Sequence, residues 1–250
     1  MKKLVAVALM LVLALSAFAV AEEAQVTSYE DFVAAEVGEL VTVETYVQAN
    51  QSWWQDTITL YTQNPEGAYF LYSMPCSEED AAKLVPGTKI RVTGRKAEWS
   101  GEVEISFDED DREIGESVFE ILEAEPFIAE PEDVTGLLGT EELAAMMNRK
   151  VAFRGMTVEP STIEGDDTQY AFLYNWDGSG QEGANNDLYF NVSKDGTTYT
   201  FTVESYLTGE GSDVYEAVKA LNVGDVVNLE GFLYWYNGAN PHITAVTAAE

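Results

Sequence analysis

Short segments of alternating apolar and polar residues run along most of the chain, and turn-forming residues separate them. A period of two is typical of strands with one face on a core and the other toward solvent. In the first half, helices are predicted at 27–37, after a Ser/Thr cap, and at 77–84. The predicted strands of this half are 39–47, two within 56–74, 89–99 and 102–107.

The second half repeats this order after an acidic, proline-containing stretch. Helices are predicted at 140–149 and 213–221, where acidic residues precede or open an amphipathic segment. Residues 170–176 and 187–192 are predicted to pair as a hairpin across a glycine-rich loop. The second copy is about 27 residues longer than the first, and the extra residues lie chiefly around this hairpin. The remaining predicted strands are 150–158, 197–207 and the strand and turn at 224–238.

Glycines recur every seven residues in both halves, at 87, 94 and 101 and again at 224, 231 and 238. A small closed barrel needs sharply coiled strands, and glycine in mid-strand permits the bend. The first of these stretches, GTKIRVTGRKAEWSGEVEI, resembles the fourth-to-fifth-strand segment of OB-fold domains in exported bacterial proteins. The resemblance covers most of residues 38–107 and, more loosely, 148–246.

The predicted fold is therefore mainly β, with two small five-stranded OB-like barrels in tandem. Each barrel has a short helix between its third and fourth strands and a helix leading into its first strand. For the second copy a differently decorated β-sandwich stays open, because its insertion is long. The predicted divisions are a signal peptide at 1–21, barrels at 22–125 and 140–250, and a linker at 126–139.

The first residues have the pattern of a secretory signal peptide. Lys2 and Lys3 precede an apolar run of about 18 residues that ends in small residues, and cleavage is expected after Ala21. We therefore expect an exported protein at the cell surface, in the periplasm or outside the cell, with no stable membrane insertion after cleavage. An uncleaved amino-terminal anchor is the alternative, since the run is barely long enough to span a bilayer.

The chain is strongly acidic, with 44 acidic and 13 basic residues and a formal charge of −31. Loss of Lys2 and Lys3 with the signal peptide leaves 11 basic residues and a charge of −33. Such a field repels phosphate backbones, so general nucleic-acid binding is disfavoured and an oligosaccharide, peptide or protein partner is expected. Cys76 is the only cysteine, which excludes an intramolecular disulfide.

Aromatic side chains supply most of the candidate ligand-binding residues, because rings can stack on bases or sugars. Within 224–238, alternation places Tyr234 and Tyr236 on the strand face opposite Trp235. The alternative is packing, since tandem barrels must bury rings where they meet. The aromatic candidates are Trp53, Trp54, Trp99, Trp176, Tyr234 and Tyr236.

A basic cluster interrupts the acidic background of the first copy and indicates an anionic ligand. Lys89, Arg91 and Arg95 are its candidate binding residues, and Lys83 and Lys96 lie nearby. The alternative is that these cations neutralise the protein's own acidic surface or protect an edge strand.

No metal site or catalytic motif is predicted. Asp108 to Asp111, or Asp177 with Asp187, could hold calcium only weakly, because the loop between the latter lacks the EF-hand pattern. Nucleophile elbows, phosphate loops and metal-binding histidine pairs are absent from the sequence. The sequence therefore favours an exported, non-enzymatic binding module with an unknown ligand. The alternatives are a carbohydrate- or cation-binding accessory domain of a secreted system, or a carboxylate-based hydrolase.

Overall fold

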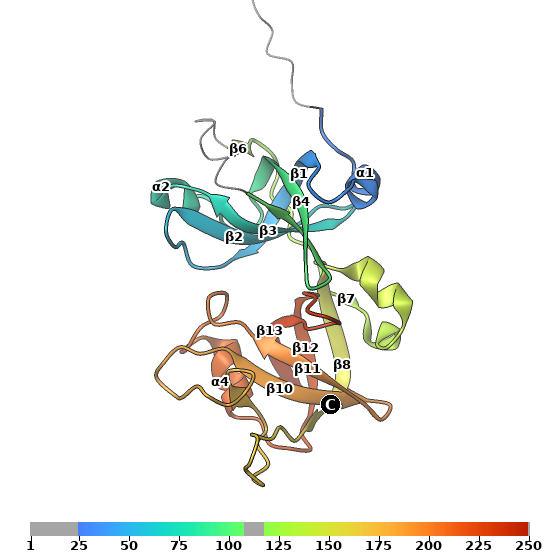
Figure 1. Ribbon diagram of the computed structural model, residues 1–250, viewed down its shortest axis with the longest axis vertical. Coiled ribbons are helices and arrows are strands. Elements are labelled where there is room, and N and C mark those ends of the chain that lie inside the picture. The colour runs from blue at the N-terminus through green and yellow to red at the C-terminus, as the bar shows by residue number, and fades with distance from the viewer. Residues whose placement is uncertain (1–24, 108–117, 250) are drawn as a thin grey trace, which may run out of the picture.

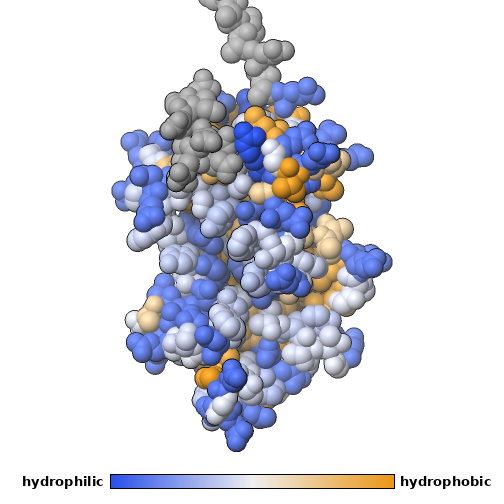
Figure 2. Space-filling model, in the orientation of Figure 1, coloured by the Kyte–Doolittle hydropathy of each residue, from blue (hydrophilic) through white to orange (hydrophobic). Residues whose placement is uncertain are grey.

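Two closed five-stranded barrels follow one another along the chain, and the predicted fold class is confirmed (Figure 1). The computed structural model describes residues 25–107 and 118–249. The predicted signal peptide and the acidic cluster at 108–111 lie outside these residues. The face in Figure 2 is mostly hydrophilic with small separate apolar patches, in keeping with the acidic composition.

Barrel 1 closes because its first strand pairs with both its second and its fourth. Strand β1 pairs antiparallel with β2 and β4, while β3 and β5 pair in parallel and complete the ring. Helix α1 precedes β1 and helix α2 separates β3 from β4, as predicted. Its elements are α1 (Tyr29–Ala34), β1 (Leu40–Asn50), β2 (Thr57–Gln63), β3 (Ala68–Pro75), α2 (Glu78–Ala81), β4 (Lys89–Trp99), β5 (Glu102–Ser106) and the added edge strand β6 (Phe119–Leu122).

Barrel 2 has the same connectivity. Strand β8 pairs with β10 and β12, and β11 pairs in parallel with β13. Short strands β7 and β9 extend the sheet at its two ends. Its elements are β7 (Glu132–Asp133), η1 (Thr135–Leu137), η2 (Glu141–Met146), β8 (Lys150–Glu159), β9 (Leu173–Tyr174), β10 (Leu188–Lys194), β11 (Thr197–Val203), α4 (Asp213–Lys219), β12 (Val226–Phe232) and β13 (His242–Ala248).

The hairpin of barrel 2 agrees with the prediction only in part, because residues 173–174 pair antiparallel with 188–189 across the glycine-rich loop and the pairing goes no further. Strand β10 pairs along its whole length with β11 across Asp195 and Gly196, both of which have positive φ angles. Asp-Gly is a strong signal for a two-residue hairpin turn, and this signal is present in the sequence. The segment 170–176 contributes only the two-residue strand β9, so the extra residues lie between the first and second strands of the barrel. The helix predicted at 140–149 is a 3-10 helix, η2.

The repeated glycines occupy matching positions in the two barrels. Gly87 and Gly224 have φ angles of 93° and 94°, which favour glycine, and each N–H donates to a first-strand carbonyl at 2.8 Å. Gly94 and Gly231 lie where neighbouring strands approach closely, because a Cβ at either position would overlap β5 or β13. The glycine repeat therefore reflects two copies of one barrel geometry.

An aromatic cluster joins the two barrels. Tyr61 of β2 and Phe70 of β3 point outward from barrel 1, and Tyr61 stacks on Phe232 of barrel 2 with ring centroids 4.6 Å apart. Phe70 contacts Tyr234 edge to face at 5.4 Å. All three residues of the cluster core, Tyr61, Phe70 and Phe232, are buried. Barrel 2 therefore covers the outer face of the second and third strands of barrel 1.

Polar contacts fix the same junction. The side chain of Asn148 donates to the carbonyl of Val103 at 2.8 Å, and Gln63 accepts the N–H of Lys150 at 2.9 Å. The hairpin of β4 and β5 extends from barrel 1 toward barrel 2 (Figure 1). Its turn is held there because the N–H of Asn237 donates to the carbonyl of Ser100 at 2.7 Å.

Candidate ligand-binding cleft

A cleft of about 700 Å³ lies on the outer face of the second and third strands of barrel 2. On β10 and β11, Leu188, Phe190 and Phe201 point into the core, so alternate residues on the same strands point outward. This aromatic cleft is lined by Trp99, Trp176, Asp187, Tyr189, Thr200, Thr202, Glu204, Tyr234, Tyr236, Asn240 and His242.

Four of the predicted aromatic candidates meet at this cleft. Trp176 comes from the connection between β8 and β10, and Tyr234 and Tyr236 come from the connection between β12 and β13. Trp99 belongs to barrel 1, at the end of β4. The sequence identified these rings one by one, and the structure brings them together from three separate segments.

Three of these rings are largely exposed. Trp176, Trp99 and Tyr236 have relative exposures of 75%, 62% and 56%. Packing between the barrels therefore does not account for these three side chains, whereas it does account for the buried rings of the junction. Large rings held at the rim of a concave surface are typical of ligand sites.

Tight turns hold the exposed rings in place. Ser100 and Gly101 both have positive φ angles, so β4 reverses directly after Trp99. Tyr236 lies in a second tight turn, where its N–H donates to the carbonyl of Gly238 at 2.8 Å. Since Asn237 of this turn binds the backbone of Ser100, the two turns are fastened to each other.

The inner wall of the cleft is a stacked pair of rings. Tyr234 and His242 stack with centroids 4.3 Å apart and an angle of 21° between their planes. The His242 Nδ1 lies 2.6 Å from the Tyr61 hydroxyl. Burial lowers the pKa of His242 to about 3 and raises the pKa of Tyr61 well above its usual value, so both groups are neutral. The imidazole of His242 is neutral and is held by both the stacking contact and the Tyr61 hydroxyl, so it supports Tyr234 in one orientation.

Two carboxylates complete the wall. Burial raises the pKa of Glu204 to about 7, and Gln51 of barrel 1 donates to its Oε2 at 3.1 Å. Asp187 accepts the N–H of Ser205 at 2.8 Å. The residues that line the cleft include neither lysine nor arginine. The site is therefore acidic and aromatic.

Sequence reasoning missed several lining residues, among them Tyr189, Glu204 and Asn240. Tyr189 could have been found from alternation, because its neighbours Leu188 and Phe190 are both apolar core residues. Glu204 gave no signal, since 44 acidic residues make any single one uninformative.

The other two tryptophan candidates lie outside the cleft. The Trp53 indole N–H donates to the carbonyl of Cys76 at 2.8 Å, and the ring is half-buried. Trp54 is exposed at the tip of the loop between β1 and β2. Burial raises the pKa of the Cys76 thiol to about 11, so this cysteine is protonated at neutral pH.

The basic candidates form ion pairs and backbone hydrogen bonds within barrel 1. Lys89 and Arg91 both bind the carboxylate of Glu44, at 2.6 and 2.7 Å. Arg95 donates to the carbonyl of Gly38 at 3.2 Å. The Lys96 ammonium is buried and donates to the carbonyls of Phe32, Val33 and Ala35 at the end of α1. These contacts favour the interpretation that the cluster neutralises the protein's own acidic groups.

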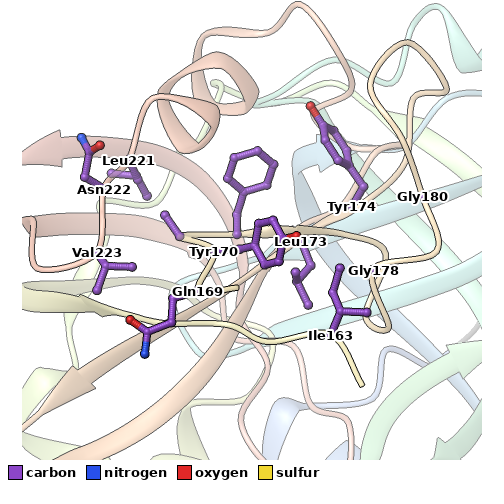
Figure 3. Close-up of a pocket in the computed structure, with 12 residues that line it drawn as sticks. Ile163, Gln169, Tyr170, Leu173, Tyr174, Gly178, Gly180, Leu221, Asn222 and Val223 are labelled. Atoms are coloured by element: carbon purple, nitrogen blue, oxygen red, sulfur yellow. The ribbon is translucent and has the colours of Figure 1, made fainter. Parts of the chain in front are cut away.

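A second cavity, of about 600 Å³, lies between the long connection of barrel 2 and the segment after α4 (Figure 3). Figure 3 shows Ile163 and Tyr170 on one side and Leu221 and Val223 on the other. Its lining contains no charged side chain. Because its lining lacks the exposed aromatic rings of the aromatic cleft, this cavity is the weaker candidate.

Within residues 25–107 and 118–249, no cluster of three or more potential metal ligands of the His, Cys, Asp or Glu type is found. Asp177, one of the weak calcium candidates, accepts the backbone N–H of Ser179 at 3.0 Å in a local turn. The same part of the chain contains no helix of the length and apolarity that a bilayer crossing requires.

No model of a known protein family and no curated protein matches this sequence. Solved structures match at low identity over most of the chain. The p204 HINb domain is 8% identical, with a TM-score of 0.35, over 86% of this chain and 99% of that domain. A murine DNA-binding protein bound with double-stranded DNA is 11% identical, with a TM-score of 0.35, over 84% and 96%. The single-stranded DNA-binding protein of Thermus aquaticus is 13% identical, with a TM-score of 0.25, over 86% and 95%.

These matches correct one expectation. The acidic composition predicts that nucleic acids are disfavoured as partners and that an oligosaccharide, peptide or protein is bound. Two of the matched structures are DNA-binding proteins by description, and one of them contains bound DNA. The expectation that nucleic acids are disfavoured as partners is therefore not kept.

Proposed function

We propose that this chain is an exported, non-enzymatic binding module whose ligand occupies the aromatic cleft of barrel 2. The convergence of three exposed rings, Trp99, Trp176 and Tyr236, on one cleft is the observation that carries the proposal. In OB-folds, ligands bind across the second and third strands, between the loops that follow strands 1 and 4. The aromatic cleft has this position in barrel 2.

The corresponding face of barrel 1 is closed to ligands. Tyr61 and Phe70 on its second and third strands are buried against Phe232 of barrel 2. Barrel 1 contributes to the site in another way, because its β4–β5 turn supplies Trp99 and its Gln51 supports Glu204. The two barrels therefore act as one binding unit with a single open face of this kind in the described residues.

A binding role is favoured over catalysis by the state of His242. This residue is the only histidine in the sequence, and a neutral ring with a pKa of about 3 that is held by Tyr61 is poorly suited to proton transfer at neutral pH. Export is proposed from the signal-peptide pattern at 1–21.

The proposal is tested by titrating tryptophan fluorescence of the mature chain with ligands of different classes. The ligands are single-stranded and double-stranded oligonucleotides, neutral oligosaccharides and small organic cations. We expect at least one class to change the emission, because Trp99 and Trp176 lie at the cleft. The variants Trp176→Ala and Tyr236→Ala should weaken that binding at least about tenfold, the loss of one stacked ring.

Trp54→Ala is the matched control, since Trp54 is as exposed as Trp99 and lies outside the cleft. It should leave affinity unchanged. Near-ultraviolet circular dichroism checks that every variant is folded. No response to any ligand class, or an equal loss of affinity in Trp54→Ala, would contradict the proposed function.

A further inference from the structure

We propose that the aromatic cleft binds organic cations of the alkylammonium class, with the ammonium group between its rings and the carboxylates of Asp187 and Glu204. This inference rests on the proposed function of the cleft and adds the chemical class of the ligand. It is carried by three features that coincide at one place: exposed ring faces, carboxylates without a cationic partner and a volume that suits a small molecule.

The rings give the first reason. The faces of indole and phenol rings carry negative potential, and weakly hydrated ammonium groups bind them within about 6 Å. Five aromatic side chains line this one cleft: Trp99, Trp176, Tyr189, Tyr234 and Tyr236. Neutral sugars and bases would use the same ring faces, so the rings alone do not decide the class.

The carboxylates give the second reason. Glu204 has a relative exposure of 9%, and its hydrogen-bond donors are the Gln51 amide and the N–H of Tyr206, both uncharged. Asp187 accepts from the N–H of Ser205. Within the described residues neither carboxylate has a lysine or arginine partner. Elsewhere in the fold acidic groups do have such partners, as Glu44 has in Lys89 and Arg91. The cleft therefore has negative charge that a cationic ligand can complement.

The surrounding charge acts in the same direction. The chain has a formal charge of −31, so its electrostatic field attracts cations. A concave site with apolar walls strengthens this field locally. Glu104 of barrel 1 adds to the local potential above about pH 7, where it is ionised, because it interacts electrostatically with the hydroxyl of Tyr234 at the inner wall. A cation that enters from solvent thus meets acidic groups from both barrels.

An organic cation fits better than a metal ion. A metal ion needs several oxygen or nitrogen ligands at short range, and no cluster of three such side chains occurs in residues 25–107 and 118–249. The cleft, of about 700 Å³, is instead within the range of small-molecule sites and presents mostly ring faces.

The test compares two molecules of the same shape and different charge. Choline and its neutral carbon isostere, 3,3-dimethylbutan-1-ol, are titrated against the mature chain, with isothermal titration calorimetry and tryptophan fluorescence as readouts. Benzyltrimethylammonium is used as a larger cation of the same class. We expect the cations to bind at least about tenfold more tightly than the neutral isostere, and this preference should decrease at high salt.

At pH 8, above the pKa of Glu204, Asp187→Asn and Glu204→Gln should each weaken choline binding about fivefold or more and leave binding of the neutral isostere unchanged. Asp177→Asn is the matched control, because Asp177 lies on the same connection and does not line the cleft. Equal affinity for choline and its isostere would overturn the inference. So would cation binding that persists unchanged in both Asp187→Asn and Glu204→Gln.

The outcomes separate this inference from the proposed function. If an oligonucleotide or a neutral sugar binds at Trp176 and Tyr236 while the cations do not, the alkylammonium class is wrong and the binding role stands. If no ligand of any class responds, both proposals fail.

Discussion

Glu102 is a buried carboxyl group at the junction of the two barrels, and its replacement by glutamine should stabilise the protein at alkaline pH. The side chain is fully buried, and its Oε2 accepts the N–H of Trp235 at 2.7 Å. Its Oε1 has no hydrogen-bond partner, and neither has the Oδ1 of neighbouring Asn148. A proton on Glu102 Oε1 would let this oxygen donate a hydrogen bond to the Oδ1 of Asn148.

The magnitude follows from the pKa. Burial raises the pKa of Glu102 from its usual 4.5 to about 8. The folded state therefore holds this proton more tightly than the unfolded state, and stability decreases as pH rises from 4.5 to about 8. At about 1.4 kcal/mol for each pH unit, the upper limit is roughly 5 kcal/mol, and relaxation of the junction should reduce it to a few kcal/mol.

Urea unfolding of the native chain and Glu102→Gln at pH 4.5, 6, 7.5 and 9 measures this effect. The glutamine side chain cannot ionise, so the stability of Glu102→Gln relative to the native chain should increase steadily over this range and level off above pH 8. Glu204, with a pKa of about 7, titrates in both proteins and cancels in the difference, whereas Glu104 interacts with Glu102 and its titration is part of the effect.

Glu98→Gln is the control, since Glu98 is an exposed carboxylate on the neighbouring strand. It should show a small difference that changes little with pH. A stability difference between Glu102→Gln and the native chain that is independent of pH would refute the reasoning that burial keeps Glu102 protonated.

Three further substitutions test the packing. Gly231→Ala should cost about 2 kcal/mol or more in thermal or urea unfolding, because its Cβ would overlap the carbonyl of His242, whereas Gly136→Ala, in open space, should be nearly neutral. Tyr61→Phe should cost about 1–3 kcal/mol in urea unfolding, since it leaves the His242 Nδ1 buried without its partner. Lys96→Met should cost about 2–3 kcal/mol and should increase amide hydrogen exchange in α1, whose last carbonyls lose their donor.

Much of the fold could be predicted because its signals are local. Alternation identifies the barrel strands, and the glycines at 87 and 224 mark the same turn in both copies. The hairpin of barrel 2 was predicted only in part, because residues 173–174 do pair with 188–189, while the long hairpin of β10 and β11 uses Asp195 and Gly196 as its turn. The position of the insertion could therefore have been predicted from turn residues.

The candidate site could be predicted only in part. Trp99, Trp176, Tyr234 and Tyr236 could be identified as candidate rings, yet the arrival of Trp99 at the cleft of the other three depends on how barrel 1 packs against barrel 2. The alternation of apolar and polar residues does not predict which outer face of one barrel is covered by the other. For the same reason, the pairing of Lys89 and Arg91 with Glu44 depends on the register between β1 and β4, which no local pattern specifies.

The most direct test of the central claim uses the five tryptophans as internal reporters. In a ¹⁵N–¹H correlation spectrum, each indole N–H gives one signal that can be assigned by substitution. Addition of choline should shift the signals of Trp99 and Trp176 and leave those of Trp53 and Trp54, which lie outside the cleft, unchanged. Shifts confined to Trp53 and Trp54, or no shift with any class of ligand, would contradict the account.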